Sequence, residues 1–284
     1  MHRSIAMLSL CAVGLAPLAA HAQVVRSGAG TLADVTAIRD AFRADLGGGT
    51  VAGANGSFGG IRREINWDAV PDAFSAPNNL PANFFNANSP RGAVFATAGT
   101  GFQLSANAGV APIAFDNIDP SYSSTFQAFS PQRLFTALGS NVVDVNFFVA
   151  GTSTAALVRG FGAIFSDVDL ANTTSIQFFG PGSVSLGTFY APSLVGSQSF
   201  SFLGVSWATP IVSRVRITNG NAALGAGVLD QNGNPVDLVV MDDFLYGEPV
   251  DARSVVPEPA TLALVGGGFL ALVGGTHRRR RRMV

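Results

Sequence analysis

The sequence SFSFLGVSWATPIVSRVRIT at residues 199–218 indicates the fold class. Its second half alternates: Val215 and Ile217 are apolar, whereas Arg214 and Arg216 are charged. A period of two residues predicts a strand with one buried and one solvated face. The first half predicts a heavily buried strand with an irregularity at Leu203–Gly204, because it supplies four large apolar side chains: Phe200, Phe202, Val205 and Trp207.

Similar short apolar runs recur about every ten residues on both sides of this stretch, which is the spacing of an all-β sandwich or barrel. With 22 Phe and 33 Gly, the architecture we expect over residues 61–250 is an antiparallel jelly-roll-like β-sandwich. Residues 68–90, rich in Pro and Asn, predict an ordered loop. The expected strands are 93–97, 101–105, 113–115, 133–136, 142–149, 158–168, 175–179, 183–190, 199–207, 211–218 and 238–246.

Residues 23–60 predict a short N-terminal helix followed by a Gly-rich linker. Thr31 and Asp34 form a capping pair, and Gly47–Gly49 ends an apolar pattern of helical spacing. We expect the helix to pack on the sheet, since its apolar stripe needs a partner. A flexibly joined arm is the alternative.

The two ends of the sequence predict export. Residues 1–22 combine a basic start, an apolar run and the small-x-small site Ala20-His21-Ala22, as a signal peptide does. After a linker at 251–255, residues 256–284 contain Val256-Pro257-Glu258-Pro259, a charge-free run to Gly275, and five arginines: Arg278, Arg279, Arg280, Arg281 and Arg282. The middle run predicts a short transmembrane helix, and the arginines predict a cytoplasmic stop. A plain tail anchor is the alternative, although it leaves Pro257 and Pro259 unexplained.

This three-part segment resembles the PEP-CTERM sorting signal of Gram-negative bacteria, over about a tenth of the chain. The resemblance implies that export machinery and signal peptidase act at one end. It further implies that an exosortase-type membrane protease cuts near Pro257-Glu258-Pro259 and that the protein passes to the cell surface or to an extracellular, biofilm-type matrix.

Several residue types are missing from the body and restrict its chemistry. Cysteine occurs only as Cys11, histidine only as His2, His21 and His277, and lysine is absent. Ser-His or Cys-His catalysis, a typical zinc site and a Walker-type NTPase are therefore excluded. Six of the 17 basic residues and one of the 18 acidic ones lie in the end segments, so the body carries a net charge of about −6. Nucleic acid, which needs a basic footprint, is not an expected partner.

Carboxylates remain as candidate site residues. Asp167 and Asp169 would share a strand face about 7 Å apart, which would suit the carboxylate pair of a glycosidase, or they mark a strand end. Asp230, Asn232, Asn234 and Asp237 supply oxygens at nearly alternate positions, as in a calcium loop, or form a hairpin turn around Gly233. We expect no cofactor apart from this structural Ca²⁺.

Asp242 and Asp243 are adjacent on a predicted strand, so one of them should point towards the apolar layer. A carboxylate there needs an arginine, backbone donors or a metal. The run Met241-Asp242-Asp243-Phe244 also resembles the last strand of jelly-roll carbohydrate-binding modules.

Two main hypotheses for function stay open, and neither is an enzyme. The first is a non-catalytic surface or matrix protein that binds extracellular polysaccharide through exposed Trp67, Tyr122, Tyr190 or Arg216. The second is a purely structural envelope protein without a sugar ligand. A carboxylate-based enzyme acting on glycosides is the third alternative.

Overall fold

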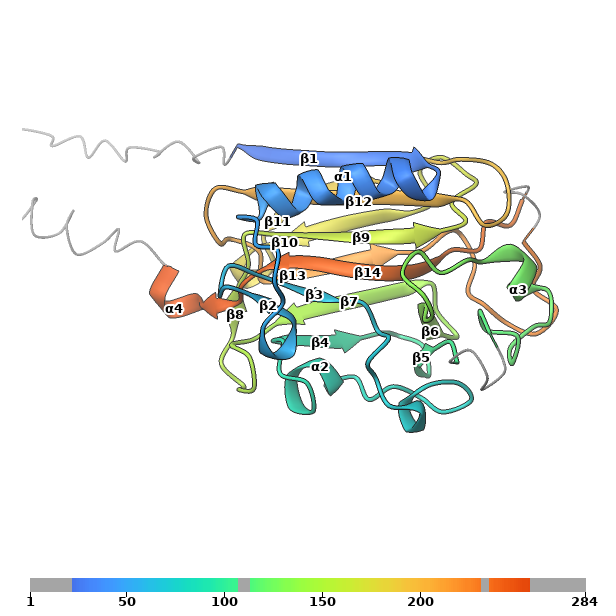
Figure 1. The fold of residues 1–284 in the computed structure, drawn as a ribbon, viewed down its shortest axis with the longest axis horizontal. Helices are drawn as coiled ribbons and strands as arrows, with labels where there is room; N and C mark the ends of the chain where they lie inside the picture. Colours follow the sequence, from blue (N-terminus) through green and yellow to red (C-terminus); the bar gives the residue numbers. More distant parts are fainter. Residues whose placement is uncertain (1–21, 107–112, 231–234, 256–284) are drawn as a thin grey trace, which may run out of the picture.

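The computed structural model describes residues 22–106, 113–230 and 235–255, which form two antiparallel sheets with an N-terminal helix (Figure 1). The predicted signal peptide, apart from Ala22, and the whole tail from Val256 lie outside these residues. No helix among the described residues has the length and apolarity to cross a bilayer. The prediction of a mostly β, antiparallel protein with few helices is confirmed, and the jelly-roll topology stays a prediction.

The larger sheet has eight strands. Its main path runs through β1 (Gln23–Gly30), β12 (Phe200–Trp207), β9 (Gly160–Ser166), β14 (Val240–Gly247), β3 (Arg62–Ile65) and β2 (Ser57–Phe58). To one side, β6 (Phe135–Leu138) pairs with both β14 and β5 (Gly101–Leu104).

The smaller sheet has five strands in the order β11 (Ser185–Tyr190), β10 (Ser175–Phe179), β13 (Arg214–Thr218), β7 (Val142–Phe147) and β4 (Ala93–Ala96). A short ladder joins β15 (Val250–Asp251) to β8 (Ala156–Leu157). The remaining elements are α1 (Leu32–Asp45), α2 (Phe84–Ala87), α3 (Tyr122–Thr125), α4 (Ala252–Val255) and 3₁₀ turns at Ala54–Gly56, Asp72–Phe74 and Pro181–Ser183.

The main core lies between the two sheets and is rich in aromatic rings. Trp67 stacks on Phe135 with ring centroids 4.3 Å apart and meets Phe85 and Phe244 edge-on at 5.5 and 5.0 Å. Phe85 belongs to the 68–90 loop, which is ordered as predicted. Such pairs contribute about 0.5–1.5 kcal/mol each beyond their buried area.

The two sheets differ in how many of their faces are covered. Strand β7 alternates between buried and half-buried residues, because the outer face of the smaller sheet meets water. Strands β9, β12 and β14 are buried at every residue. On the outer side of the larger sheet, α1 contacts β1 and β12 (Figure 1).

Helix α1 packs on the sheet as predicted. Its capping box is formed by Thr31 and Asp34. Phe42 packs against Phe202 with centroids 5.5 Å apart and occupies a space that side chains at Gly162 and Gly204 would fill, since a Cβ at either glycine would lie 2.8 Å from its ring.

Three sequence-based expectations are wrong. Gly204 causes no strand irregularity, because β12 keeps continuous register with both neighbours and the missing side chain makes room for Phe42. Residues 113–115 form a turn, with positive φ at Ala114 and Phe115. Part of the expected helix-and-linker segment is strand β1, an edge strand paired with β12 over eight residues.

The sandwich has two distinct ends. The start of β1 and helix α4 lie at one end, which we call the terminal end, and α3 lies at the other, the far end (Figure 1). Strand β9 runs towards the far end and β14 returns from it, so the turns after β9 and before β14 meet there.

Candidate functional site

Three carboxylates meet at the far end of the sandwich. Asp167 and Asp169 follow the last residue of β9, and Asp230 lies in the connection that precedes β14. One carboxylate oxygen from each lies within 4.8 Å of the others. We call these three residues the far-end triad.

Asp167 and Asp169 are buried and have few hydrogen-bond donors around them. Asp167 is 0% exposed and Asp169 is 3% exposed. Both carboxylate oxygens of Asp167 and Oδ2 of Asp169 have no hydrogen-bond partner among the described residues. The nearby amide of Gln198 donates to the Thr125 carbonyl at 2.8 Å. A buried carboxylate without donors or a counter-charge is strongly disfavoured.

Burial raises the pKa of Asp167 to about 9, and repulsion from Asp230 and Asp169 adds to the shift. The pKa of Asp169 is also raised, chiefly by burial. Asp167 has φ 72°, a left-handed conformation that Asp tolerates better than most residues. Burial and the neighbouring carboxylates thus both disfavour the ionised form of Asp167.

Asp237 supports the triad through hydrogen bonds to the segment that carries Asp169. Its Oδ1 accepts the Asp169 amide at 3.0 Å, and its Oδ2 accepts the Leu170 amide at 3.4 Å and the Thr173 hydroxyl. Because both of its oxygens already accept hydrogen bonds, Asp237 holds the turn after β9 and is not one of the three converging ligands. Burial raises its pKa as well.

Asp169 and Asp230 each accept a hydrogen bond from a backbone amide. Oδ1 of Asp169 accepts the Gly196 amide at 2.7 Å, and Oδ1 of Asp230 accepts the Leu238 amide at 3.1 Å. Three carboxylates held this closely have two chemical states available: one or more stay protonated, or a cation neutralises them. Catalysis on a large substrate is poorly served, since Asp167 and Asp169 have almost no exposed surface.

The structure brings together a different set of carboxylates from the metal ligands that the sequence predicted. Of the predicted ligands, Asp230 is in the triad and Asp237 supports it, whereas Asn232 and Asn234 lie outside the described residues. Asp167 and Asp169 were expected on one strand face about 7 Å apart. They lie instead in the turn after β9. The Asp-x-Asp after a buried strand was the available signal, but nothing in the sequence showed that Asp230 would join it.

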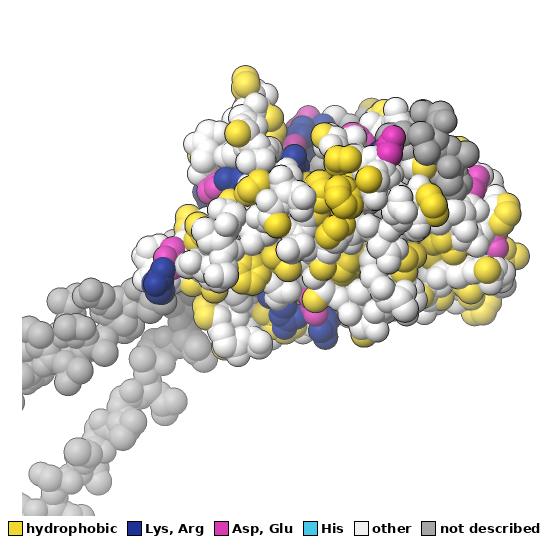
Figure 2. Space-filling model, turned by 90° about the horizontal axis from the view of Figure 1, so that it is seen from below, with side chains coloured by type: hydrophobic (Ala, Val, Ile, Leu, Met, Phe, Trp, Pro, Cys, Tyr) yellow, Lys and Arg dark blue, Asp and Glu magenta, His cyan; other side chains and the backbone are white. Residues whose placement is uncertain are grey.

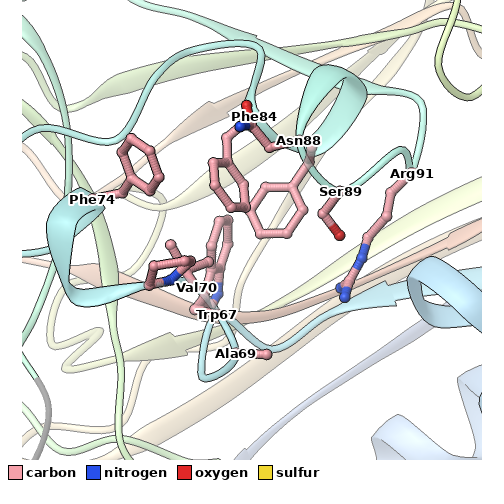
Figure 3. Close-up of a pocket in the computed structure, with 10 residues that line it drawn as sticks. Trp67, Ala69, Val70, Phe74, Phe84, Asn88, Ser89 and Arg91 are labelled. Carbon is pink, nitrogen blue, oxygen red and sulfur yellow. The ribbon is translucent and has the colours of Figure 1, made fainter.

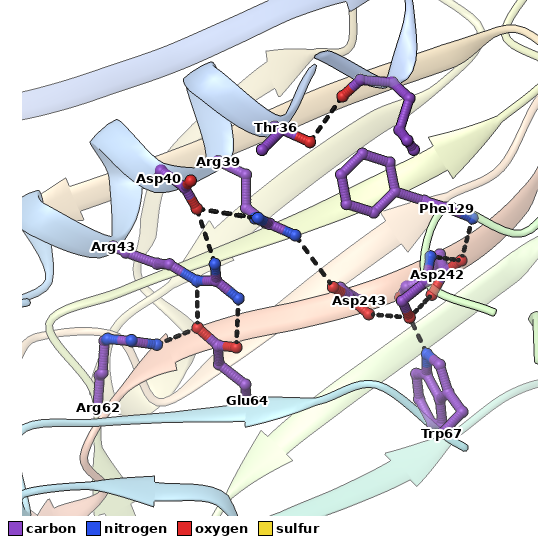
Figure 4. Close-up of polar contacts among 12 residues, drawn as sticks. Thr36, Arg39, Asp40, Arg43, Arg62, Glu64, Trp67, Phe129, Asp242 and Asp243 are labelled. Atoms are coloured by element: carbon purple, nitrogen blue, oxygen red, sulfur yellow. Dashed lines mark hydrogen bonds and ion pairs between the residues drawn. The ribbon is translucent and has the colours of Figure 1, made fainter. Parts of the chain in front are cut away.

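Asp242 and Asp243 form a second carboxylate pair, on β14 beneath α1 (Figure 4). A register shift between Met241 and Phe244 places both of these neighbours in the main core, with the two carboxylates between them. Both carboxylates accept the Ser130 hydroxyl, at 3.1 and 2.7 Å. The expectation that the pair points to opposite sides is wrong, because the bulge interrupts the alternation.

Donors surround this second pair. Oδ2 of Asp242 accepts the amides of Phe129 at 2.6 Å and Ser130 at 3.2 Å. The guanidinium of Arg39 lies 3.9 Å from Asp243 (Figure 4). The predicted partners, an arginine and backbone donors, are thus present. Burial, followed by repulsion from Asp243, raises the pKa of Asp242 well above its ordinary value.

Two of the four predicted ligand contacts are not exposed. Trp67 is 1% exposed and its Nε1–H donates to the Asp242 carbonyl at 3.0 Å, whereas Tyr122 is 0% exposed and its hydroxyl donates to Val228 at 2.8 Å. Each polar atom has found an internal partner, which lets the ring be buried. Tyr190 is 49% exposed and the Arg216 side chain is 47% exposed, so these two remain predicted contacts.

A pocket of about 350 Å³ opens beside Trp67 (Figure 3). Phe74, Phe84 and Val70 line it, and Arg91 lies at one side. Nε of Arg91 has no hydrogen-bond partner among the described residues, although its NH1 donates to the Glu64 carbonyl.

Figure 2 shows the molecule from below the view of Figure 1, where hydrophobic and uncharged groups predominate.

The predicted sorting segment lies outside the described residues, and comparison with known proteins identifies it. A family model for the PEP-CTERM protein-sorting motif matches residues 255–281, which confirms the sequence-based assignment. No curated protein and no solved structure matches the chain significantly. The motif implies export, membrane-anchored sorting in Gram-negative bacteria, and processing by the export machinery and an exosortase. The chain therefore carries a PEP-CTERM protein-sorting motif at residues 255–281.

Proposed function

We propose that this chain is a non-catalytic protein of the cell surface or extracellular matrix, with the sandwich as the part presented outside the cell. The sorting motif at residues 255–281 is the observation that carries the proposal. The body contains neither histidine, cysteine nor lysine, so most nucleophilic and acid–base mechanisms lack their usual groups.

The arrangement of the sandwich supports presentation at a surface. The start of β1 and helix α4 both lie at the terminal end (Figure 1). A tail that leaves beyond Val255 would therefore tether that end to the membrane, and the far end would point away from it. The transient anchor and its removal are part of the proposal.

Mass spectrometry of the protein recovered outside the cell tests this function. We expect a carboxyl terminus near Pro257-Glu258-Pro259, without His277 and the arginines. A variant with alanine at Pro257 and Pro259 should stay with the membrane fraction, whereas the control Arg253→Gln, at an exposed residue before the motif, should be sorted normally. Extracellular material that keeps Arg278–Arg282 would contradict the proposal.

Polysaccharide is the ligand class with a specific supporting observation. Tyr190 pairs with Ser175, and Arg216 pairs with Gln177, two residues further along β10. Directly opposed residues share a face, as do i and i+2, so Tyr190 and Arg216 lie on the outer face of the smaller sheet. A polar face with an exposed aromatic ring suits sugar binding.

An array of extracellular polysaccharides, probed with the exported chain, tests the sugar proposal. Binding should fall at least tenfold in Tyr190→Ala and in Arg216→Ala, and should persist in Val184→Ala, which removes an exposed apolar group in the turn before β11. Failure of the unmodified chain to bind any glycan would favour the purely structural alternative.

A further inference from the structure

The far-end triad has features that protein stability alone does not explain. Asp167 is fully buried, yet both of its oxygens lack a donor among the described residues, and they lie beside two more carboxylates. A carboxylate buried without donors costs several kcal/mol unless it is protonated or neutralised by a counter-charge. Among the described residues, no basic side chain makes an ion pair with Asp167 or Asp169.

The spacing of the triad fits one cation. Ca²⁺ binds oxygens at about 2.3–2.6 Å, so two ligands on opposite sides of one ion are about 5 Å apart. The three oxygens lie within 4.8 Å of one another and so fit around a single ion of this size. The oxygens of Asp167 and Oδ2 of Asp169 have coordination capacity left, because no donor uses them.

The ligand type selects the class of metal. Carboxylates suit Ca²⁺, Mg²⁺ and Mn²⁺, whereas zinc and copper favour the imidazole and thiolate ligands that this body lacks. Three carboxylates from two chain segments form a site that adapts to variable coordination, which Ca²⁺ accepts better than the strictly octahedral Mg²⁺.

We propose that Asp167, Asp169 and Asp230 bind one Ca²⁺ ion, which ties the turn after β9 to the connection that enters β14. Asp237 is a positioning residue that presents Asp169 through its amide. The ion would join segments more than 60 residues apart in the sequence and would stabilise the far end of the sandwich. The site itself does not depend on the proposed sorting, and only the expected range of Kd draws on the exported location.

Equilibrium dialysis and thermal unfolding of the full chain in mild detergent test the site. We expect one bound Ca²⁺ per chain, with Kd in the range of about 10⁻⁴–10⁻³ M that is typical of extracellular modules. At a hundredfold excess over Kd, Ca²⁺ should raise Tm by about 5–10 °C relative to chelator. Absence of binding at 10 mM Ca²⁺ would overturn the proposal, whatever happens at the sorting motif.

Three variants locate the ion. Asp167→Asn and Asp230→Asn should each weaken binding at least tenfold and so remove about half of the Tm shift or more. Asp230 is only partly buried, and asparagine there can still accept the Leu238 amide, so this variant should fold. The control Asp144→Asn, which changes a carboxylate on β7 paired with Arg214 and Arg216, should keep the whole shift.

Two further outcomes would overturn parts of the assignment. Unchanged Ca²⁺ binding in both Asp167→Asn and Asp230→Asn would place the ion elsewhere. Equal binding and stabilisation by Mg²⁺ would overturn the choice of Ca²⁺.

Discussion

The two carboxylate clusters near strands β9 and β14 differ in the hydrogen-bond donors and counter-charges that surround them. Asp242 and Asp243 receive two backbone amides, a hydroxyl and a nearby arginine. Asp167, after the neighbouring strand β9, receives no hydrogen bond within the described chain. The first pair is thus stabilised by the protein itself, whereas the far-end triad depends on protons or on a cation. The comparison teaches that burial alone does not tell a structural carboxylate from a binding one, and that the inventory of donors does.

The largest effect should come from removing the best-supported carboxylate. Asp242→Ala leaves the amides of Phe129 and Ser130 without their acceptor in a buried site. Unsatisfied buried donors cost about 1–3 kcal/mol each, so we expect the free energy of unfolding to fall by about 3 kcal/mol. Urea denaturation should give the same loss in Ca²⁺ and in chelator. A loss below about 1 kcal/mol would contradict this account of the pair.

The second-largest effect should be a change in the free energy of unfolding with pH, caused by Asp242. Because the folded-state pKa of Asp242 is raised, the folded protein binds more protons than the unfolded chain above about pH 4. Stability should therefore rise as the pH falls through the folded-state pKa of Asp242 towards pH 4, by about 1.4 kcal/mol for each pKa unit between the two states. Asp243, Arg39, Glu64 and Asp68 also influence this pair electrostatically.

Denaturation at several pH values in saturating Ca²⁺ measures this slope. Asp242→Asn should flatten it relative to the unmodified chain, whereas Asp144→Asn should leave it unchanged. An equal slope in Asp242→Asn would show that other carboxylates dominate.

Replacing Arg39, which lies beside Asp243, should have a smaller effect on the free energy of unfolding. Arg39 lies 3.9 Å from Asp243 and packs over the Phe129 ring at 5.1 Å. Arg39→Gln should cost about 1 kcal/mol, because one counter-charge and one cation–π contact are lost. Arg253→Gln, at an exposed pair with Asp251, should leave the denaturation midpoint unchanged. A larger loss at Arg253 than at Arg39 would reverse the argument.

The smallest effect should come from Asp167→Asn in chelator. Its carboxyl has a pKa of about 9 and is therefore already neutral near pH 7 in the absence of a cation. Asparagine is neutral, similar in shape and tolerant of the left-handed backbone there. We expect a change of less than about 1 kcal/mol in urea denaturation. A loss of 3 kcal/mol would instead mean that the carboxylate has structural donors.

The sequence predicted the local elements best. Thr31 and Asp34 marked the start of α1, and the alternation around Val215 and Ile217 marked β13. These signals depend on neighbours a few residues apart, so they survive without knowledge of the fold. Strand β1 was missed, because its apolar residues are few and its strand state depends on pairing with β12, far along the chain.

The candidate site was predicted only in part, for a related reason. Asp230 was predicted as a candidate cation ligand, but the two carboxylates beside it in the structure, Asp167 and Asp169, lie about 60 residues earlier in the sequence. Burial of Trp67 was also missed, since the carbonyl of Asp242 that satisfies its indole nitrogen lies 175 residues away. The bulge at Asp242 required knowledge of the register with β9.

The position of β15 has a consequence for proteolytic maturation. The last described ladder pairs Val250 and Asp251 with Leu157 and Ala156, and every described strand ends before Val256. A protease acting on the sorting motif would therefore sever no pair of strands described here. Severing the tail should release a protein whose melting temperature equals that of its precursor.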